Sequence, residues 1–104
     1  MRLLPEFFAQ ITRFDWDAGS SEKNWRRHAV TQAETEQAFI NRPVIVMSSP
    51  QSPVSEVRHF ALGQSDRGRR LTIVFTLRGS LLRVISARPM SRRERRFYAQ
   101  VETS

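Results

Sequence analysis

The sequence predicts an α+β fold, with N-terminal helices packed on a mainly antiparallel sheet of four to five strands and a basic helix at the C-terminus. Up to Pro43 the apolar residues recur at helical spacing, whereas after it they alternate with a period of two. Two segments, at Thr31 and at Ser91, open with the spacing of a capping box. We expect residues 1–104 to form one domain, with 1–12 as an N-terminal extension of it.

The first half of the chain predicts a short strand and two helices. Residues 13–16 alternate between polar and aromatic side chains, which is typical of a short strand. Asp17 is placed to cap a helix that runs to about His28. A second helix should run from Thr31 to about Asn41, because a proline follows two residues later.

The second half predicts four antiparallel strands joined by turns, as in a meander. These runs are rich in β-branched and aromatic residues, and clusters of Gly, Pro and Ser separate them. The four runs are Val44–Met47, Val57–Leu62, Leu71–Leu77 and Leu81–Arg88. On the last run, simple alternation puts Arg88 on the same face as Val84 and puts Arg83 on the opposite face.

Positive charge is concentrated in the second half of the chain. The net charge is +7, and residues 1–55 contribute nothing to it, because they carry six basic and six acidic side chains. Residues 56–104 carry eleven arginines against four acidic residues, which accounts for the whole +7. A basic face built by the second half of the fold indicates an anionic partner, either nucleic acid or an acidic protein.

Arginines stand out in the last helix and in two of the strands. At about 100° per residue, the helix arginines cover one side and its apolar residues share the other. The arginines are Arg92, Arg93, Arg95 and Arg96, and the apolar side holds Phe97, Tyr98 and Val101. A planar guanidinium suits phosphate or a row of carboxylates. Arg58, Arg83 and Arg88 lie inside apolar strands, so we expect them to be paired or to lie at a functional rim.

Several classes of protein are disfavoured by what the sequence lacks. It has no cysteine and only two histidines, so neither a disulfide framework nor a metal-ligand spacing is present. No apolar run approaches the roughly 18 residues that span a bilayer, and Pro5 and Glu6 interrupt the apolar N-terminus. We therefore expect a cytoplasmic protein with no cofactor, no metal and no membrane contact.

Taken together, the motifs resemble the BrnT toxin family. The matching segments follow the family's order and cover roughly residues 14–100. They are Phe14–Asp17, Asn24–Val30, Arg58–Gly63, Gly68–Thr76, Arg83–Arg88 and Arg92–Tyr98. The chain departs from the family pattern at Ser20, where Lys is usual, and at Ala29, where Gly is usual and where the change suggests a less strained turn.

This resemblance implies a RelE-like fold and a ribonuclease toxin of a type II toxin–antitoxin pair, which cleaves mRNA without a metal and inhibits translation. It also implies a BrnA-like antitoxin with a ribbon-helix-helix domain, so that operator DNA is contacted only through the antitoxin. Two alternatives from other classes stay open. One is a non-catalytic basic module that binds RNA or the antitoxin and acts as an operon co-repressor, and the other is a ribosome-associated RNA-binding protein.

The candidate catalytic residues are Arg58, Arg83, Arg88 and His28. Metal-free RNA cleavage needs a base for the 2′-hydroxyl, cations for the charge that builds on phosphorus, and an acid for the leaving oxygen. The arginines would supply the cations, and His28 would serve in proton transfer, a role for which histidine is commonly used. The alternatives are that Arg83 pairs with Asp17, that Arg88 pairs with the capping-box Glu, and that His28 only caps its helix.

Five further residues are expected to contact RNA, and these are Arg69, Arg78, Arg92, Arg93 and Tyr98. For Tyr98 the alternative is core packing, because it shares the apolar side of its helix. His59 is predicted to be a surface or packing histidine, and both Trp16 and Trp25 are predicted to lie in the core.

Overall fold

The computed structural model describes residues 13–48 and 57–103. Within them, five strands form one sheet in the order β1-β5-β4-β3-β2, with helices packed against it. The elements are β1 (Arg13–Asp15), α2 (Ala18–His28), α3 (Gln32–Ile40), β2 (Ile45–Ser48), β3 (Arg58–Gln64), β4 (Arg70–Arg78), β5 (Leu81–Pro89) and α4 (Arg92–Glu102). The predicted fold class is confirmed, whereas the extension at 1–12 and most of the loop after β2 lie outside the described residues.

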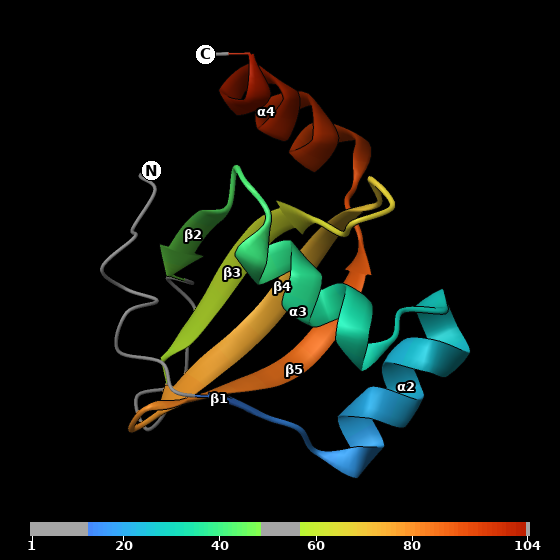
Figure 1. Ribbon diagram of the computed structural model, residues 1–104, viewed down its shortest axis with the longest axis vertical. Helices are drawn as coiled ribbons and strands as arrows, with labels where there is room; N and C mark the ends of the chain where they lie inside the picture. Colours follow the sequence, from blue (N-terminus) through green and yellow to red (C-terminus); the bar gives the residue numbers. More distant parts are fainter. Residues whose placement is uncertain (1–12, 49–56, 104) are drawn as a thin grey trace.

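Strands β2 to β5 form the predicted antiparallel meander. The short strand β1 adds to its edge and runs parallel to β5, with Phe14 opposite Leu82 and Asp15 opposite Arg83. Figure 1 shows α3 lying across the sheet and α2 lying beside β5. The two helices carry the chain from the β1 edge of the sheet to the β2 edge.

The main core lies between the sheet and the two N-terminal helices. It is built from alternate residues of β4, among them Ile73 and Phe75, which are fully buried against Ala38 and Phe39 of α3. Gly63 of β3 lets α3 approach closely, because a Cβ there would lie 2.3 Å from the carbonyl oxygen of Ala38. Alternation on the strands and helical spacing on α3 therefore meet in one core, as the sequence predicts.

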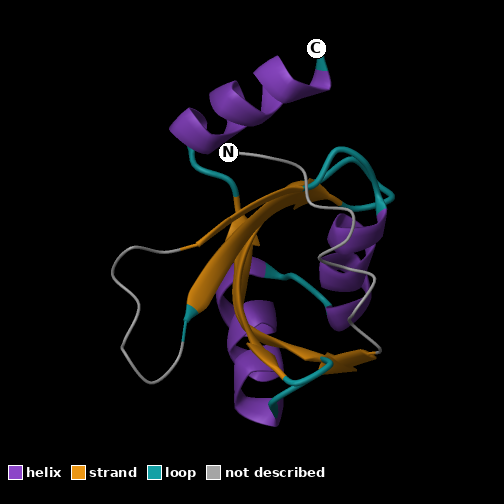
Figure 2. Cartoon of the chain, turned by 90° about the vertical axis from the view of Figure 1, so that its left-hand side faces the viewer, coloured by secondary structure: helices purple, strands orange, loops and turns teal. Residues whose placement is uncertain are grey.

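The opposite face of the sheet is covered at one end by α4, which Figure 2 shows beyond the sheet and away from the other helices. Tyr98 of α4 packs with Ile45, Leu62 and Met90 in a second, smaller cluster. The predicted capping box at Ser91 is confirmed: its hydroxyl accepts from the Glu94 amide, and the Glu94 carboxylate accepts from the Ser91 amide.

A β-bulge in β5 corrects the alternation predicted for this strand. Val74 of β4 pairs with Ser86 and the next residue pairs with Val84, so Ile85 is the extra residue. Leu82 and Val84 face the main core, and beyond the bulge Ala87 does so as well. The prediction that Arg83 and Arg88 project to opposite faces is therefore wrong, because the bulge returns both to the face away from α2 and α3.

The turn after α2 also differs from the expectation. Ala29 adopts a φ of 53°, the left-handed region in which a side chain is strained and glycine is not. Its amide bonds to the carbonyl of Trp25, which closes the helix. The expectation of a less strained turn is wrong, because the backbone keeps the left-handed conformation although the residue has a Cβ.

Candidate functional site

Two arginines and a threonine form a row across the face of the sheet that α2 and α3 leave open. Arg58 of β3 pairs with Thr76 of β4, and Thr76 pairs with Arg83 of β5, so the three side chains share a face. We call these three residues the arginine row. At a strand spacing of about 4.8 Å, the two arginine Cα atoms lie about 10 Å apart. The threonine between them is small and buried, and two guanidinium groups on one face are suited to bind an anion.

Arg83 is held in this row by two aspartates. Its Nη2 lies 3.2 Å from Asp17 Oδ2, and its Nε lies 3.9 Å from Asp15 Oδ2. The other oxygen of Asp17 accepts from the amide of Gly19 at 2.7 Å, which caps the start of α2 as predicted. The pairing of Arg83 with Asp17, which was the alternative to a catalytic role for this residue, is therefore present. It fixes Arg83 while leaving its side chain 25% exposed.

Arg88 is held by Glu94 in a two-pronged ion pair. Its Nη1 donates to Oε1 at 2.8 Å and its Nη2 donates to Oε2 at 3.0 Å. Thr72 donates to the same carboxylate at 2.9 Å, so Glu94 joins β4, β5 and the start of α4. Burial alone would raise the pKa of Glu94, but the hydrogen bonds from Arg88, Ser91 and Thr72 outweigh it and lower the pKa to about 2.

Arg88 does not join the arginine row. It pairs with Thr72, four residues before Thr76 on β4, so it lies about 14 Å along the strand from the row. Arg92 and Arg93 are exposed at the start of α4, and among the residues described neither side chain has a hydrogen bond or ion pair. The predicted group of Arg58, Arg83 and Arg88 is thus divided between the row and a second group, which consists of Arg88, Arg92 and Arg93.

Arg78 belongs with the row. It ends β4 two residues after Thr76, on the same face, and it is exposed next to the hairpin turn at Gly79. The candidate site is therefore a strip that begins at the hairpin, crosses the row and continues toward α4.

Arg69 and His28 lie together at the other end of the sheet. The guanidinium of Arg69 donates to the carbonyl oxygens of His28 at 2.5 Å and Ala29 at 2.8 Å, and it pairs with Glu34 at 3.2 Å. Arg69 precedes Thr76 by seven residues, which is about 24 Å along an extended strand. This arrangement separates His28 from the arginine row and gives Arg69 three acceptors that join α2, α3 and β4.

His59 and Tyr98 are both packing residues. His59 stacks on Phe75 with ring centroids 5.3 Å apart, and burial lowers its pKa. Tyr98 is fully buried, and its hydroxyl donates to the carbonyl of Pro43 at 2.6 Å. The packing prediction for His59 is confirmed, and the placement of Tyr98 corrects its assignment as an RNA contact, because no part of its side chain reaches the surface.

The two tryptophans differ. Trp16 is partly buried against the main core, and its indole NH donates to Glu36 at 2.8 Å. Trp25 is 57% exposed on α2, so the prediction that it lies in the core is wrong. Its helix turns Asn24 toward the sheet instead, where the side chain is buried and accepts from the amide of Ala87.

Sequence reasoning missed the partners that shape this site. Thr76 carries no signal of its own, and its place between two arginines depends on strand register. The charge pattern does show Lys23 and Arg27 four residues apart on one helix, but no role was predicted for them. Among residues 13–48 and 57–103, no group of three or more acidic residues or histidines could hold a metal ion. No helix in that part of the chain is long and apolar enough to span a membrane.

Comparisons with known proteins agree with this architecture. A family model described as the ribonuclease toxin BrnT of type II toxin–antitoxin systems matches residues 16–94. Among solved structures, the fold is similar to that of the Brucella abortus ribonuclease toxin BrnT, with a TM-score of 0.55 and 20% identity. That similarity covers 77% of this chain and 97% of the Brucella chain. No curated protein sequence matches the chain significantly.

Proposed function

The chain belongs to the BrnT family of ribonuclease toxins of type II toxin–antitoxin systems, and we propose that it cleaves mRNA in the cytoplasm without a metal ion and so inhibits translation. The arginine row carries this proposal. It presents two guanidinium groups on either side of a small residue, on a face that α2 and α3 do not cover. This arrangement suits the charge that develops on a phosphodiester during cleavage.

In the proposed reaction, the 2′-oxygen of the ribose attacks phosphorus and the bond to the 5′-oxygen breaks. The 2′-proton passes to a base, and the leaving 5′-oxygen takes up a proton, so the products are a 2′,3′-cyclic phosphate and a 5′-hydroxyl. Arg58 and Arg83 would neutralise the non-bridging oxygens during this step. DNA lacks the 2′-hydroxyl and should resist cleavage.

Proton transfer at the row falls to the carboxylates beside Arg83 or to water. Asp15 and Asp17 are the acidic groups paired with Arg83, whereas His28 lies at the other end of the sheet. A carboxylate is a weak base at neutral pH, so the reaction would depend chiefly on stabilisation of charge. Arg78 and the exposed arginines of α4, Arg92 and Arg93, would hold the flanking RNA.

The family assignment includes an antitoxin partner, and we propose that it is BrnA-like, with a ribbon-helix-helix domain that alone contacts operator DNA. It would inhibit the toxin by covering the exposed arginines with acidic or polar groups. The test is competition between purified antitoxin and RNA. Simultaneous binding without loss of affinity for either ligand would contradict inhibition by occlusion.

The test of cleavage uses the purified protein and a single-stranded RNA, with and without EDTA. We expect cyclic-phosphate ends in both conditions, and no product from an RNA with a 2′-deoxyribose at the cleavage position. Arg83→Ala and Arg58→Ala should each lower the rate of cleavage about 100-fold while the circular dichroism spectrum stays that of a folded protein. Product that forms only when a divalent cation is present would contradict the metal-free mechanism.

A second candidate function is a non-catalytic basic module that acts as co-repressor with the antitoxin. One observation favours it: Arg83 and Arg88 are both engaged by carboxylates, as in a purely structural role. This alternative predicts RNA or antitoxin binding without any cyclic-phosphate product, and no arrest of growth on expression.

A further inference from the structure

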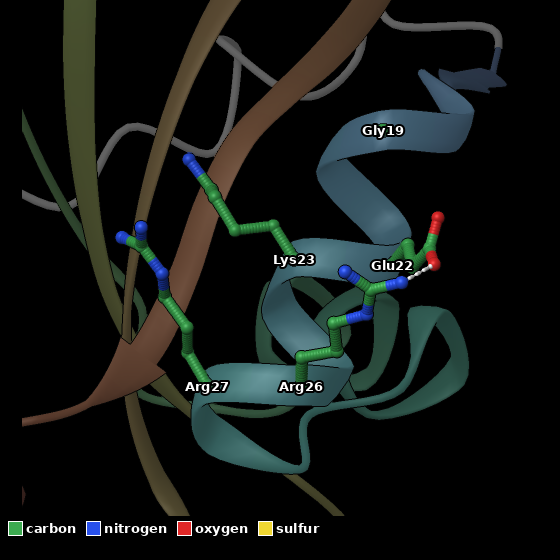
Figure 3. A pocket seen from close by; sticks show the side chains of 5 residues that line it. All are labelled: Gly19, Glu22, Lys23, Arg26 and Arg27. Carbon is green, nitrogen blue, oxygen red and sulfur yellow. Dashed lines mark hydrogen bonds and ion pairs between the residues drawn. The ribbon is translucent and has the colours of Figure 1, made fainter.

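A hollow beside α2, outside the arginine row, is lined by basic side chains. Its lining residues are Gly19, Glu22, Lys23, Arg26 and Arg27, and its volume is about 280 Å³ (Figure 3). Arg26 bends toward Glu22 and forms an ion pair with it, so these two charges offset each other. The described part of the chain provides no acidic partner for Lys23 or Arg27.

Lys23 and Arg27 form a matched pair of cations. They lie one helical turn apart, and Figure 3 shows both side chains leaving α2 on the side of β5. Like charges at this spacing destabilise a helix. The helix dipole favours a cation in the last turn, which accounts for Arg27, but Lys23 lies in the middle of α2 and gains little from it. Two unneutralised cations over one hollow are the arrangement expected of an anion site.

Helix α2, which lines the hollow, is anchored to the sheet at two points. Asn24, which lies between the two cations on the helix, is buried and accepts from the amide of Ala87 in β5 at 3.1 Å. At the start of the helix, Asp17 bonds both to the amide of Gly19 and to Arg83. Because both anchors join α2 to β5, the helix that carries the two cations is held in place before any ligand arrives.

The hollow also adjoins the arginine row. Gly19 lines it, and a single aspartate, Asp17, separates Gly19 from Arg83. The end of β1 and the start of α2 meet β5 at the same residue, since Asp15 pairs with Arg83 and Asp17 forms an ion pair with it. A strand of RNA whose scissile phosphate lies at the row would therefore carry a neighbouring phosphate to the hollow.

We propose that Lys23 and Arg27 bind a phosphate of single-stranded RNA next to the one that is cleaved. This inference rests on the proposed function and adds a binding subsite to it. RNA is favoured over an acidic peptide because the hollow continues the path of the arginine row, whose geometry suits phosphate. The subsite reads the backbone and carries no base preference of its own.

The experiment compares Lys23→Gln, Arg27→Gln and the double variant with the wild type and with Arg67→Gln. Arg67 is an exposed arginine of the β3–β4 loop, so its replacement removes one positive charge away from the hollow. Two substrates are used, a dinucleotide with a single phosphodiester and an RNA of twenty nucleotides. For the long RNA we expect the double variant to raise KM about tenfold and to flatten the slope of log Kd against log salt by about 0.7, the value for one lost phosphate contact.

The dinucleotide has no neighbouring phosphate, so its cleavage should be the same in every variant. Unchanged binding of long RNA and an unchanged salt slope in the double variant would overturn the subsite, as would an equal loss in Arg67→Gln. Weakened binding of a poly-glutamate peptide with RNA binding intact would assign the hollow to an acidic protein and also overturn it. RNA binding by the wild type without cleavage would contradict the proposed function alone, whereas the absence of any RNA binding would overturn both.

Discussion

The change Glu94→Gln tests the ion pair that joins α4 to the sheet. Glutamine keeps the shape of the side chain and can still complete the capping box with Ser91, so the change removes mainly the charge opposite Arg88. The pKa of Glu94 is lowered from its ordinary value of 4.5 to about 2. A lowering of this size corresponds to about 3 kcal/mol of stability from the ionised carboxylate. Because the side chain is 24% exposed, solvent screens part of this energy. We therefore expect Glu94→Gln to lower the free energy of unfolding by about 2 kcal/mol at pH 7.

The dependence on pH gives the sharper result. Because the pKa of Glu94 is lower in the folded state than in the unfolded chain, its contribution is complete above about pH 4.5 and is lost as the pH falls toward 2. Urea denaturation of wild type and variant should therefore show a difference of about 2 kcal/mol at pH 7 that shrinks between pH 5 and pH 2.

The matched control is Glu102→Gln, which removes another glutamate of α4 that pairs with an arginine, here Arg70. This pair lies in the last turn of α4, where the helix dipole disfavours an acidic side chain. We therefore expect Glu102→Gln to lower the free energy of unfolding by less than about 1 kcal/mol. Equal losses in the two variants at pH 7, or a Glu94→Gln difference that persists unchanged to pH 2, would refute this reasoning.

Three other substitutions test the packing, each by the free energy of unfolding in urea. Ala29→Gly should stabilise the protein by about 1 kcal/mol, because φ is 53° at this position; a loss of stability would count against the left-handed turn. Gly63→Ala should destabilise it by about 2 kcal/mol or more, since the new Cβ would lie 2.3 Å from a carbonyl oxygen of α3, and a neutral result would contradict that close approach. Arg69→Gln should lower the free energy of unfolding by about 2 kcal/mol, because it leaves Glu34 without its cation and leaves two carbonyl groups without a donor. An unchanged midpoint of urea unfolding would show that these contacts do not join the helices.

Local features of the fold could be predicted from the sequence because they depend on residues a few positions apart. The capping box of Ser91 needs only the Glu three residues later, and the strands follow from alternation. The parallel pairing of β1 with β5 could not be predicted, because it joins segments almost 70 residues apart. The bulge at Ile85 shows the same limit, since one extra residue reverses the alternation on which the placement of Arg88 depended.

The site was predictable in its residue types and less so in its geometry. Charge and burial arguments identified Arg58 and Arg83 inside apolar strands, and the register places them in one row. The same arguments could not separate Arg88 from that row, because its distance depends on the strand register. They could not place Tyr98 inside the core either, because that outcome depends on how α4 packs on the sheet. Trp25 is exposed for a related reason: Asn24, and not the larger aromatic residue, faces β5.

A double-mutant cycle on Arg58 and Arg83 tests the central claim most directly, namely that both arginines act on the same phosphate across Thr76. The measurement is kcat/KM for a dinucleotide, with wild type, Arg58→Gln, Arg83→Gln and the double variant. Loss of one such cation should lower kcat/KM about 100-fold, and the double variant should lose much less than the product of the two single losses. Losses that simply multiply, or a single variant with the wild-type rate, would show that the row does not act as one site.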